Sequence, residues 1–330
     1  FRAIEFLGRH NIPFVRFWAS YFDNRKPYRE DPRRYWHNMD LLVAACERAR
    51  VGLIPTLFWN AWNVPFDFDE FRSAWLDEDS RTRRYAAQYT REFVTRYRNR
   101  SIIWAWEFAN EDNLAWDLPN AIALLPEGRK DNRNIVRSMA GMVAVRAFAR
   151  EVRALDRTRP ISSGASEVRP AQYRIATMPF KPGEHWGEDT PEQALEATSW
   201  TAPAPVDLLS MHHYEAPGGY DPAATRAWLR TAGERARALK RPLFLGEFGI
   251  LGHWTPTPAN FDDAGYRAAL SDYFDALCES RAALAAYWAF TADSRQFTGA
   301  AAPDYDRFNY VFDLIAAYNR KCAGRFISSR

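Results

Sequence analysis

The strongest constraint on the fold is the alternation of short apolar runs with longer amphipathic stretches along all 330 residues. The runs are almost continuously apolar, which is typical of strands buried on both faces in a parallel sheet. They span residues 14–18, 51–59, 101–110, 161–164, 206–212, 242–247 and 284–290. Such repeated strand–helix units predict a parallel α/β protein.

The intervening stretches place apolar residues at helical spacing, so a helix is expected around nearly every strand. The expected helices span residues 1–10, 36–50, 81–98, 135–155, 223–240, 264–280 and 311–321. Seven strands preceded by a helix predict a (β/α)8 barrel whose first strand would lie upstream of Phe1. We expect one catalytic barrel domain over residues 1–330, because no composition shift marks a boundary.

Charge and cysteine content argue against several classes of protein. The net charge is only +3 and the basic residues are dispersed, which favours a solvated surface over a nucleic-acid site. No apolar run reaches the roughly 18 residues of a membrane span. Cys46, Cys278 and Cys322 form neither a disulfide framework nor a metal motif, and Cys46 and Cys278 fit as apolar fillers in helices. No cofactor is expected. No signal peptide is visible, which leaves secreted and cytoplasmic locations both open.

Four long connections follow strands, at residues 21–35, 60–79, 112–132 and 164–205. They exceed the usual two to six residues, and loops after barrel strands lie at the face where barrel enzymes place their sites. Within the last of them, residues 181–190 are a candidate lid. The 13 Trp fit a cleft in which flat rings stack on sugars.

Two carboxylates end apolar strands, Glu111 in WAWEFANE and Glu247 in PLFLGE. A buried charge is costly unless it has a partner or a role, and in a barrel the ends of different strands converge. Two carboxylates across a cleft suit glycoside hydrolysis. The alternative is that each pairs with an Arg to close the barrel mouth.

These segments resemble those of glycoside hydrolase clan A, and most of all family 5, the cellulase and mannanase family. SIIWAWEFANE resembles the segment that carries the acid/base, here Asn110 and Glu111, and LFLGEFG the segment of the nucleophile, here Glu247. Three further matches complete the pattern: VRFW with Arg16, LLSMHHY with His212 and Tyr214, and YWAF with Trp288.

The resemblance implies a retaining β-glycosidase with an oligosaccharide or polysaccharide substrate of glucan or mannan type. Glu247 would attack as the ionised nucleophile, supported by Arg16 and the Tyr214 hydroxyl. Glu111 would be protonated first and act as the base in the second step. Asn110 would bind the sugar 2-hydroxyl, Trp288 would form the floor of the sugar site, and His212 would bind near the acid/base or the substrate. Retention implies carboxyl groups about 5–5.5 Å apart.

Two simpler interpretations stay open. Arg16 could neutralise Glu107 on the same strand as Glu111, and Trp288 could be core. Because neighbours on a strand point to opposite faces, His212 and His213 make a poor metal site, and no metal is expected.

The sequence departs from the family pattern in two places. TLFWNAWN stands where many members carry a His near the end of strand three, which leaves the sugar undetermined, and Asp112 stands where many have Pro. The candidate sugar contacts are Trp59, Asn60, Trp62, Trp186, His253 and Trp254, each of which could equally pack within a loop.

Two rival classes remain. A non-catalytic carbohydrate-binding barrel would bind sugar without hydrolysis, although both carboxylates are present. A metal-dependent barrel hydrolase would need a His and Asp cluster, and no H-x-H motif ends an early strand. Exo or endo action and oligomeric state are not decided by the sequence.

Overall fold

Each apolar run overlaps one strand in the computed structural model, which describes residues 2–20, 26–118, 120–178, 186–214, 220–250, 263–290 and 310–327. The strands are β1 (Phe14–Trp18), β2 (Gly52–Phe58), β3 (Trp106–Ala109), β4 (Ile161–Ser162), β5 (Leu209–Tyr214), β6 (Leu243–Gly249) and β7 (Leu284–Tyr287). They form two sheets, ordered β1-β2-β3-β4 and β5-β6-β7. The pairs β2/β3, β3/β4 and β6/β7 are parallel, which confirms the predicted parallel arrangement.

Most strands differ in extent from the apolar runs that predicted them, and the differences in β3 and β5 bear on the candidate site. β3 covers only four residues and β4 only two, with Trp106 opposite Ile161 and Glu107 opposite Ser162. β5 starts at Leu209 and continues through Tyr214, so that both His212 and Tyr214 lie within the strand.

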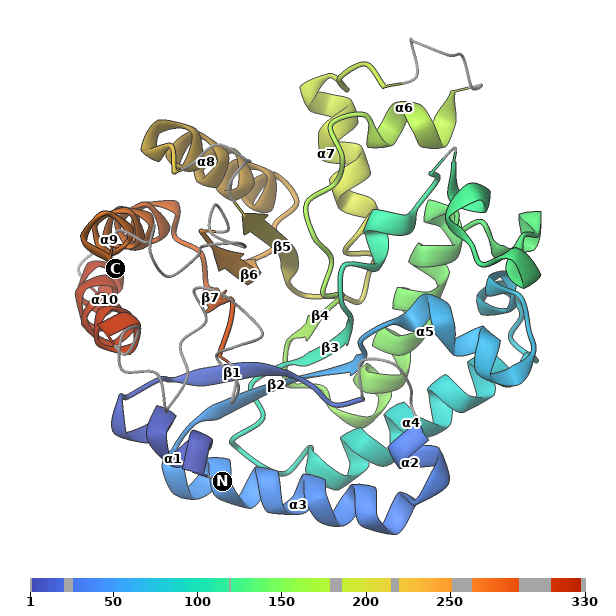
Figure 1. The fold of residues 1–330 in the computed structure, drawn as a ribbon, viewed down its shortest axis with the longest axis horizontal. Helices are drawn as coiled ribbons and strands as arrows, with labels where there is room; N and C mark the ends of the chain where they lie inside the picture. Colours follow the sequence, from blue (N-terminus) through green and yellow to red (C-terminus); the bar gives the residue numbers. More distant parts are fainter. Residues whose placement is uncertain are drawn as a thin grey trace. The chain divides into compact units, whose positions relative to one another are not determined.

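The helices follow the expected order. They are α1 (Arg2–Arg9), α2 (Lys26–Glu30), α3 (Pro32–Ala49), α4 (Arg81–Tyr97), α5 (Ser138–Leu155), α6 (Gln172–Thr177), α7 (Pro191–Trp200), α8 (Pro222–Ala238), α9 (Asp263–Ser280) and α10 (Tyr310–Ile327). In α4 the apolar spacing predicted the helix correctly. The Ser80 hydroxyl caps its first turn, and Tyr89, Phe93 and Tyr97 are buried on one face. Figure 1 shows α4 and α5 beside β3 and β4, and α8, α9 and α10 beside β5 to β7.

Helix α5 begins at Ser138, three residues later than expected, and Met139 in its first turn is 59% exposed. The buried side instead carries small residues around Gly141, against which the Trp116 ring packs so closely that a Cβ on Gly141 would lie 2.2 Å from it.

Helices α6 and α7 were missed inside the long connection 164–205. A signal was present for α7: Thr190 and Gln193 form a capping box, with Pro191 in the first turn. The candidate lid at residues 181–190 lies partly outside the described residues, and its described end leads into this cap.

The loops after β2 and β3 are folded into short 3-10 helices. They are η1 (Ala61–Phe68), η2 (Arg72–Leu76), η3 (Asp112–Ala115), η4 (Ala121–Leu124), η5 (Glu127–Arg129) and η6 (Asn132–Asn134). Asn134 joins the two loops, because its Oδ1 accepts from the Arg72 N–H at 2.9 Å and its Nδ2 donates to the Arg129 carbonyl at 2.8 Å. The two long connections therefore hold each other.

The chain divides into two compact units, each built from separate segments. The first unit contains residues 1–15, 38–53 and 211–330, and the second contains residues 16–37 and 54–210. The chain passes from one to the other inside β1, α3, β2 and β5. Domain boundaries usually fall in exposed linkers, so these crossings are consistent with the single domain, which stays a prediction.

The expectation for the cysteines needs one correction. Cys278 on α9 is disulfide-bonded to Cys322 on α10, with the Cα atoms 5.6 Å apart. Spacing along the sequence did not reveal this pair, because the two helices bring together residues 44 positions apart. Cys46 is free and buried.

Candidate active site

In the second unit, the end of β3 carries Asn110 and Glu111 on a constrained backbone. Glu111 has φ of 51°, in the left-handed region that non-glycine residues rarely adopt. The Glu111 N–H donates to the Gly164 carbonyl at 2.9 Å, and the Asn110 N–H donates to the Trp59 carbonyl at 3.3 Å. Such backbone conformations persist where the surroundings hold them, and they cluster at active sites.

Gly164 is required for this arrangement. Its φ is 71°, and a Cβ there would lie 1.8 Å from the Ala109 carbonyl oxygen, on the strand that leads to Glu111. Only glycine permits both the backbone conformation and the close approach.

Arg16 and Asn110 are joined in the same unit. Arg16 Nη2 donates to Asn110 Oδ1 at 2.8 Å, and Arg16 Nε donates to Glu107 Oε1 at 2.5 Å. The alternative that Arg16 neutralises Glu107 is therefore confirmed. The Arg16 guanidinium also lies over the Trp59 ring, 5.1 Å from its centroid.

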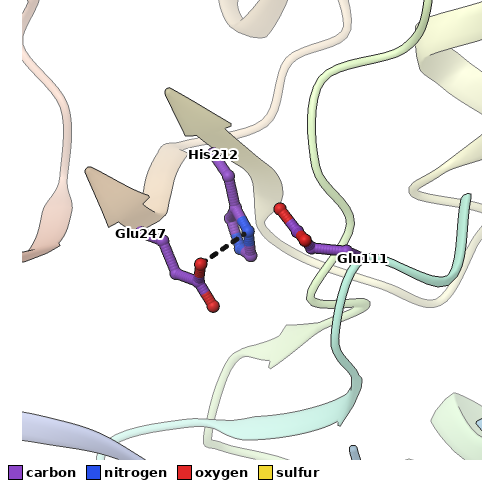
Figure 2. Close-up of side chains that lie close together, drawn as sticks. All are labelled: Glu111, His212 and Glu247. Atoms are coloured by element: carbon purple, nitrogen blue, oxygen red, sulfur yellow. Dashed lines mark ion pairs between the residues drawn. The ribbon is translucent and has the colours of Figure 1, made fainter. Parts of the chain in front are cut away.

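In the first unit, β5 and β6 bring Tyr214, His212 and Glu247 together. The Tyr214 hydroxyl donates to Glu247 Oε2 at 2.5 Å, and His212 Nδ1 lies 3.5 Å from the same oxygen. Figure 2 shows the His212 ring directed at the Glu247 carboxylate. Glu247 is 4% exposed, so these groups stabilise a carboxylate that has little access to water.

Trp288 belongs to this first unit as well. Its backbone N–H donates to the backbone carbonyl of Phe248, the residue after Glu247, at 2.8 Å. The peptide bond that follows Trp288 is cis. Trp288 is half-buried.

His213 points away from this group, as alternation along a strand requires. Its Nδ1 lies 2.6 Å from the Tyr273 hydroxyl, and its ring stacks on Trp228 with centroids 4.1 Å apart. Burial lowers the pKa of His213 to about 4. It is a neutral packing residue between β5 and the helices.

The candidate sugar contacts divide by exposure. Trp62 is buried and donates its indole N–H to the Asp112 carbonyl at 2.9 Å, and Trp59 is 4% exposed beneath Arg16. Asn60 is half-buried, whereas Trp186 is 51% exposed. His253 and Trp254 lie outside the described residues. All six stay predictions as sugar contacts.

Sequence reasoning gave no role to two residues beside the site. Trp18, at the end of β1, is 39% exposed and lies against Trp59 with ring centroids 4.6 Å apart. Asp112 has a buried carboxyl whose Oδ2 finds no hydrogen-bond partner within the described part of the chain. Burial raises the pKa of Asp112 well above its usual range, although Arg72 opposes the shift. The departure from Pro at this position was the signal that could have found it.

No helix in the described ranges is both long and apolar enough to cross a membrane.

Comparison with known proteins relates the fold to a set of solved enzymes. No family model matches the sequence, and the search of curated proteins found no match. An endo-β-1,4-mannanase from Thermotoga petrophila aligns over 97% of this chain and 72% of its own, with 17% identity and a TM-score of 0.64. An endo-1,4-β-mannanase from Rhizomucor miehei aligns over 98% and 90%, with 13% identity and a TM-score of 0.63.

A glycoside hydrolase family 5 mannosidase from Rhizomucor miehei aligns over 98% of this chain and 87% of its own, with 13% identity and a TM-score of 0.60. These structures are (β/α)8 barrels. The chain has this fold. The predicted barrel and the resemblance to family 5 are thus confirmed at the level of architecture.

Proposed function

We propose that this protein is a retaining β-glycosidase that hydrolyses a β-linked glycan of mannan or glucan type. The observation that carries the proposal is Glu247, a buried carboxylate two residues before the end of β6, which Tyr214 and His212 contact. The fold is similar to that of enzymes named as mannanases and a mannosidase.

In the first step, Glu247 attacks the anomeric carbon while Glu111 gives its proton to the leaving oxygen. A covalent glycosyl-enzyme forms and the aglycone departs. In the second step, Glu111 takes a proton from water, which attacks the anomeric carbon and releases Glu247. The barrel fold supports this pairing, because strand ends converge at one face.

The Tyr214 hydroxyl suits the nucleophile role of Glu247. A donated hydrogen bond stabilises the ionised carboxylate and holds the attacking oxygen in place. Asn110 stands one residue before Glu111 and would bind the sugar 2-hydroxyl, a contact that strengthens in the transition state.

The first test is hydrolysis of aryl β-mannosides, aryl β-glucosides, mannan and glucan by the wild-type protein and Glu247→Ala. We expect activity on at least one substrate and a loss of more than about 1,000-fold in the variant. Proton NMR of the first-formed sugar should show the β anomer. An α first product would contradict retention, and binding without hydrolysis would support the non-catalytic class.

The role of Glu111 has its own test. Glu111→Ala should retain the first step on substrates with good leaving groups, because these need no protonation, and should lose it on unactivated glycans. Added azide should attack the accumulated glycosyl-enzyme and give a β-glycosyl azide. Glu247→Ala is the matched control and should give no β-glycosyl azide, because it cannot form the glycosyl-enzyme. A chelator should leave wild-type activity unchanged, whereas inactivation would favour the metal-dependent class.

A further inference from the structure

Glu107 is a fully buried carboxylate to which the proposed reaction assigns no step. It lies on β3, four residues before Glu111, and is 0% exposed. An isolated ionised carboxylate in such a place is strongly unfavourable. The structure surrounds it with donors: Arg16 Nε at 2.5 Å, Thr56 Oγ1 at 2.6 Å and Ser162 Oγ at 2.9 Å.

The sheet register explains why these donors meet. Thr56 on β2 and Ser162 on β4 are the register partners of Glu107, so the three side chains share one level across neighbouring strands. Oε1 accepts from Arg16 and Thr56, and Oε2 accepts from Ser162. The carboxylate is therefore held at both oxygens, which fixes the direction in which it binds the guanidinium.

The other end of Arg16 reaches Asn110. Nη2 donates to Asn110 Oδ1 at 2.8 Å, and the Arg16 side chain is only 4% exposed. A guanidinium can only donate, so the amide atom that faces it must be the oxygen. The Asn110 NH2 group is thereby turned away from Arg16, and the amide cannot flip without losing this bond.

We propose that Glu107 is a positioning residue that acts through Arg16 to fix the orientation of the Asn110 amide. Asn110 then presents a donor, and the sugar hydroxyl that it binds must accept. This inference rests on the proposed function for its catalytic consequence. A group that strengthens its contact in the transition state contributes most when it is already oriented, because a displacement of about 1 Å can cost about 100-fold in rate.

The kinetic test is a double-mutant cycle of Glu107→Gln and Asn110→Ala. Glu107→Gln should lower kcat about 10- to 100-fold with KM changed less than about threefold. In the Asn110→Ala background, Glu107→Gln should cost less than about threefold further, because the group that it positions is gone. The proposal would be overturned if Glu107→Gln lowered kcat by the same factor in the wild type and in Asn110→Ala. A Glu107 that only stabilises the fold would give that result.

Glu151→Gln is the matched control. It makes the same substitution in a carboxylate that accepts from Arg91 at 2.8 and 3.0 Å between α4 and α5, so kcat should fall less than about threefold. Should Glu107→Gln not fold, Arg16→Lys replaces it in the cycle, because Lys keeps the charge and loses the planar fork that reaches both partners. The same non-additivity with Asn110→Ala is expected.

A structural measurement separates this inference from the proposed function. In a crystal structure of Glu107→Gln, or of Arg16→Lys, the Asn110 amide should be reoriented or its bond to residue 16 lost. An amide that keeps its orientation would overturn the positioning role. If the wild-type protein hydrolyses no glycoside, the proposed function fails, and this measurement still decides whether Glu107 orients Asn110.

Discussion

At the scale of single residues, the candidate site contains constrained backbone positions as well as carboxylates. Glu111 holds a left-handed conformation, and its N–H is bonded to the carbonyl of Gly164. Side-chain chemistry could be inferred from the residue types, but this contact joins positions 53 apart in the chain. Only the pairing of β3 with β4 puts them together.

Gly164→Ala should destabilise the protein by about 2 kcal/mol or more and reduce hydrolysis, because the new Cβ would overlap the Ala109 carbonyl. Urea unfolding and kcat on an aryl glycoside measure the two effects. Gly128→Ala is the control, since a Cβ there meets nothing within 4 Å. Equal behaviour of the two variants would contradict the prediction.

Asp112→Asn should change how stability depends on pH. The raised pKa means that the folded protein keeps the Asp112 proton above pH 3.8, where the unfolded chain has lost it, so wild-type stability falls as pH rises through this window. Asn has no proton to lose. The stability of the variant relative to the wild type should therefore increase as pH rises above about 3.8, as followed by urea midpoints. A difference that does not vary with pH would refute the prediction.

At the scale of elements, the two faces of β5 place its polar side chains in different surroundings. His212 and Tyr214 face Glu247, whereas His213 faces Tyr273 and Trp228 from the helices. This alternation follows from the strand itself and was predictable. The packing of α8 and α9 around His213, which decides its protonation, was not.

His213 should make the protein less stable in acid. Its pKa of about 4 in the folded state lies below the ordinary 6.5, so between these values the unfolded chain binds a proton that the folded chain does not. The effect of His213 on the free energy of unfolding is absent above pH 6.5. It grows to at most about 3 kcal/mol of destabilisation near pH 4. His213→Phe keeps an aromatic ring against Trp228 and should lose less stability than the wild type over this window. The prediction would be contradicted if the free energy of unfolding of His213→Phe and of the wild type changed with pH in the same way.

At the scale of the whole molecule, the two compact units share their elements. Each crossing of the chain falls inside a helix or strand, so neither unit is a continuous segment that could fold before the other segments arrive. The single catalytic domain expected from the sequence implies that both unfold together.

Urea unfolding should therefore be one transition, with coincident midpoints by Trp fluorescence and far-UV circular dichroism. Gly164→Ala, whose substitution lies in the second unit, should shift both midpoints by the same amount. Two separate transitions, or a shift in one probe alone, would contradict the single domain.

The sequence alone determined the strand–helix alternation and the barrel, because periodicity and apolar runs report local burial. Residue type and order also led to the prediction that Glu111, Glu247 and their neighbours form the active site. Tertiary structure decided which partners these residues have. The Glu107–Arg16–Asn110 chain, the Gly164 contact and the Cys278–Cys322 bond all join residues distant in sequence. Strand register and helix packing set such distances, and no local pattern encodes them.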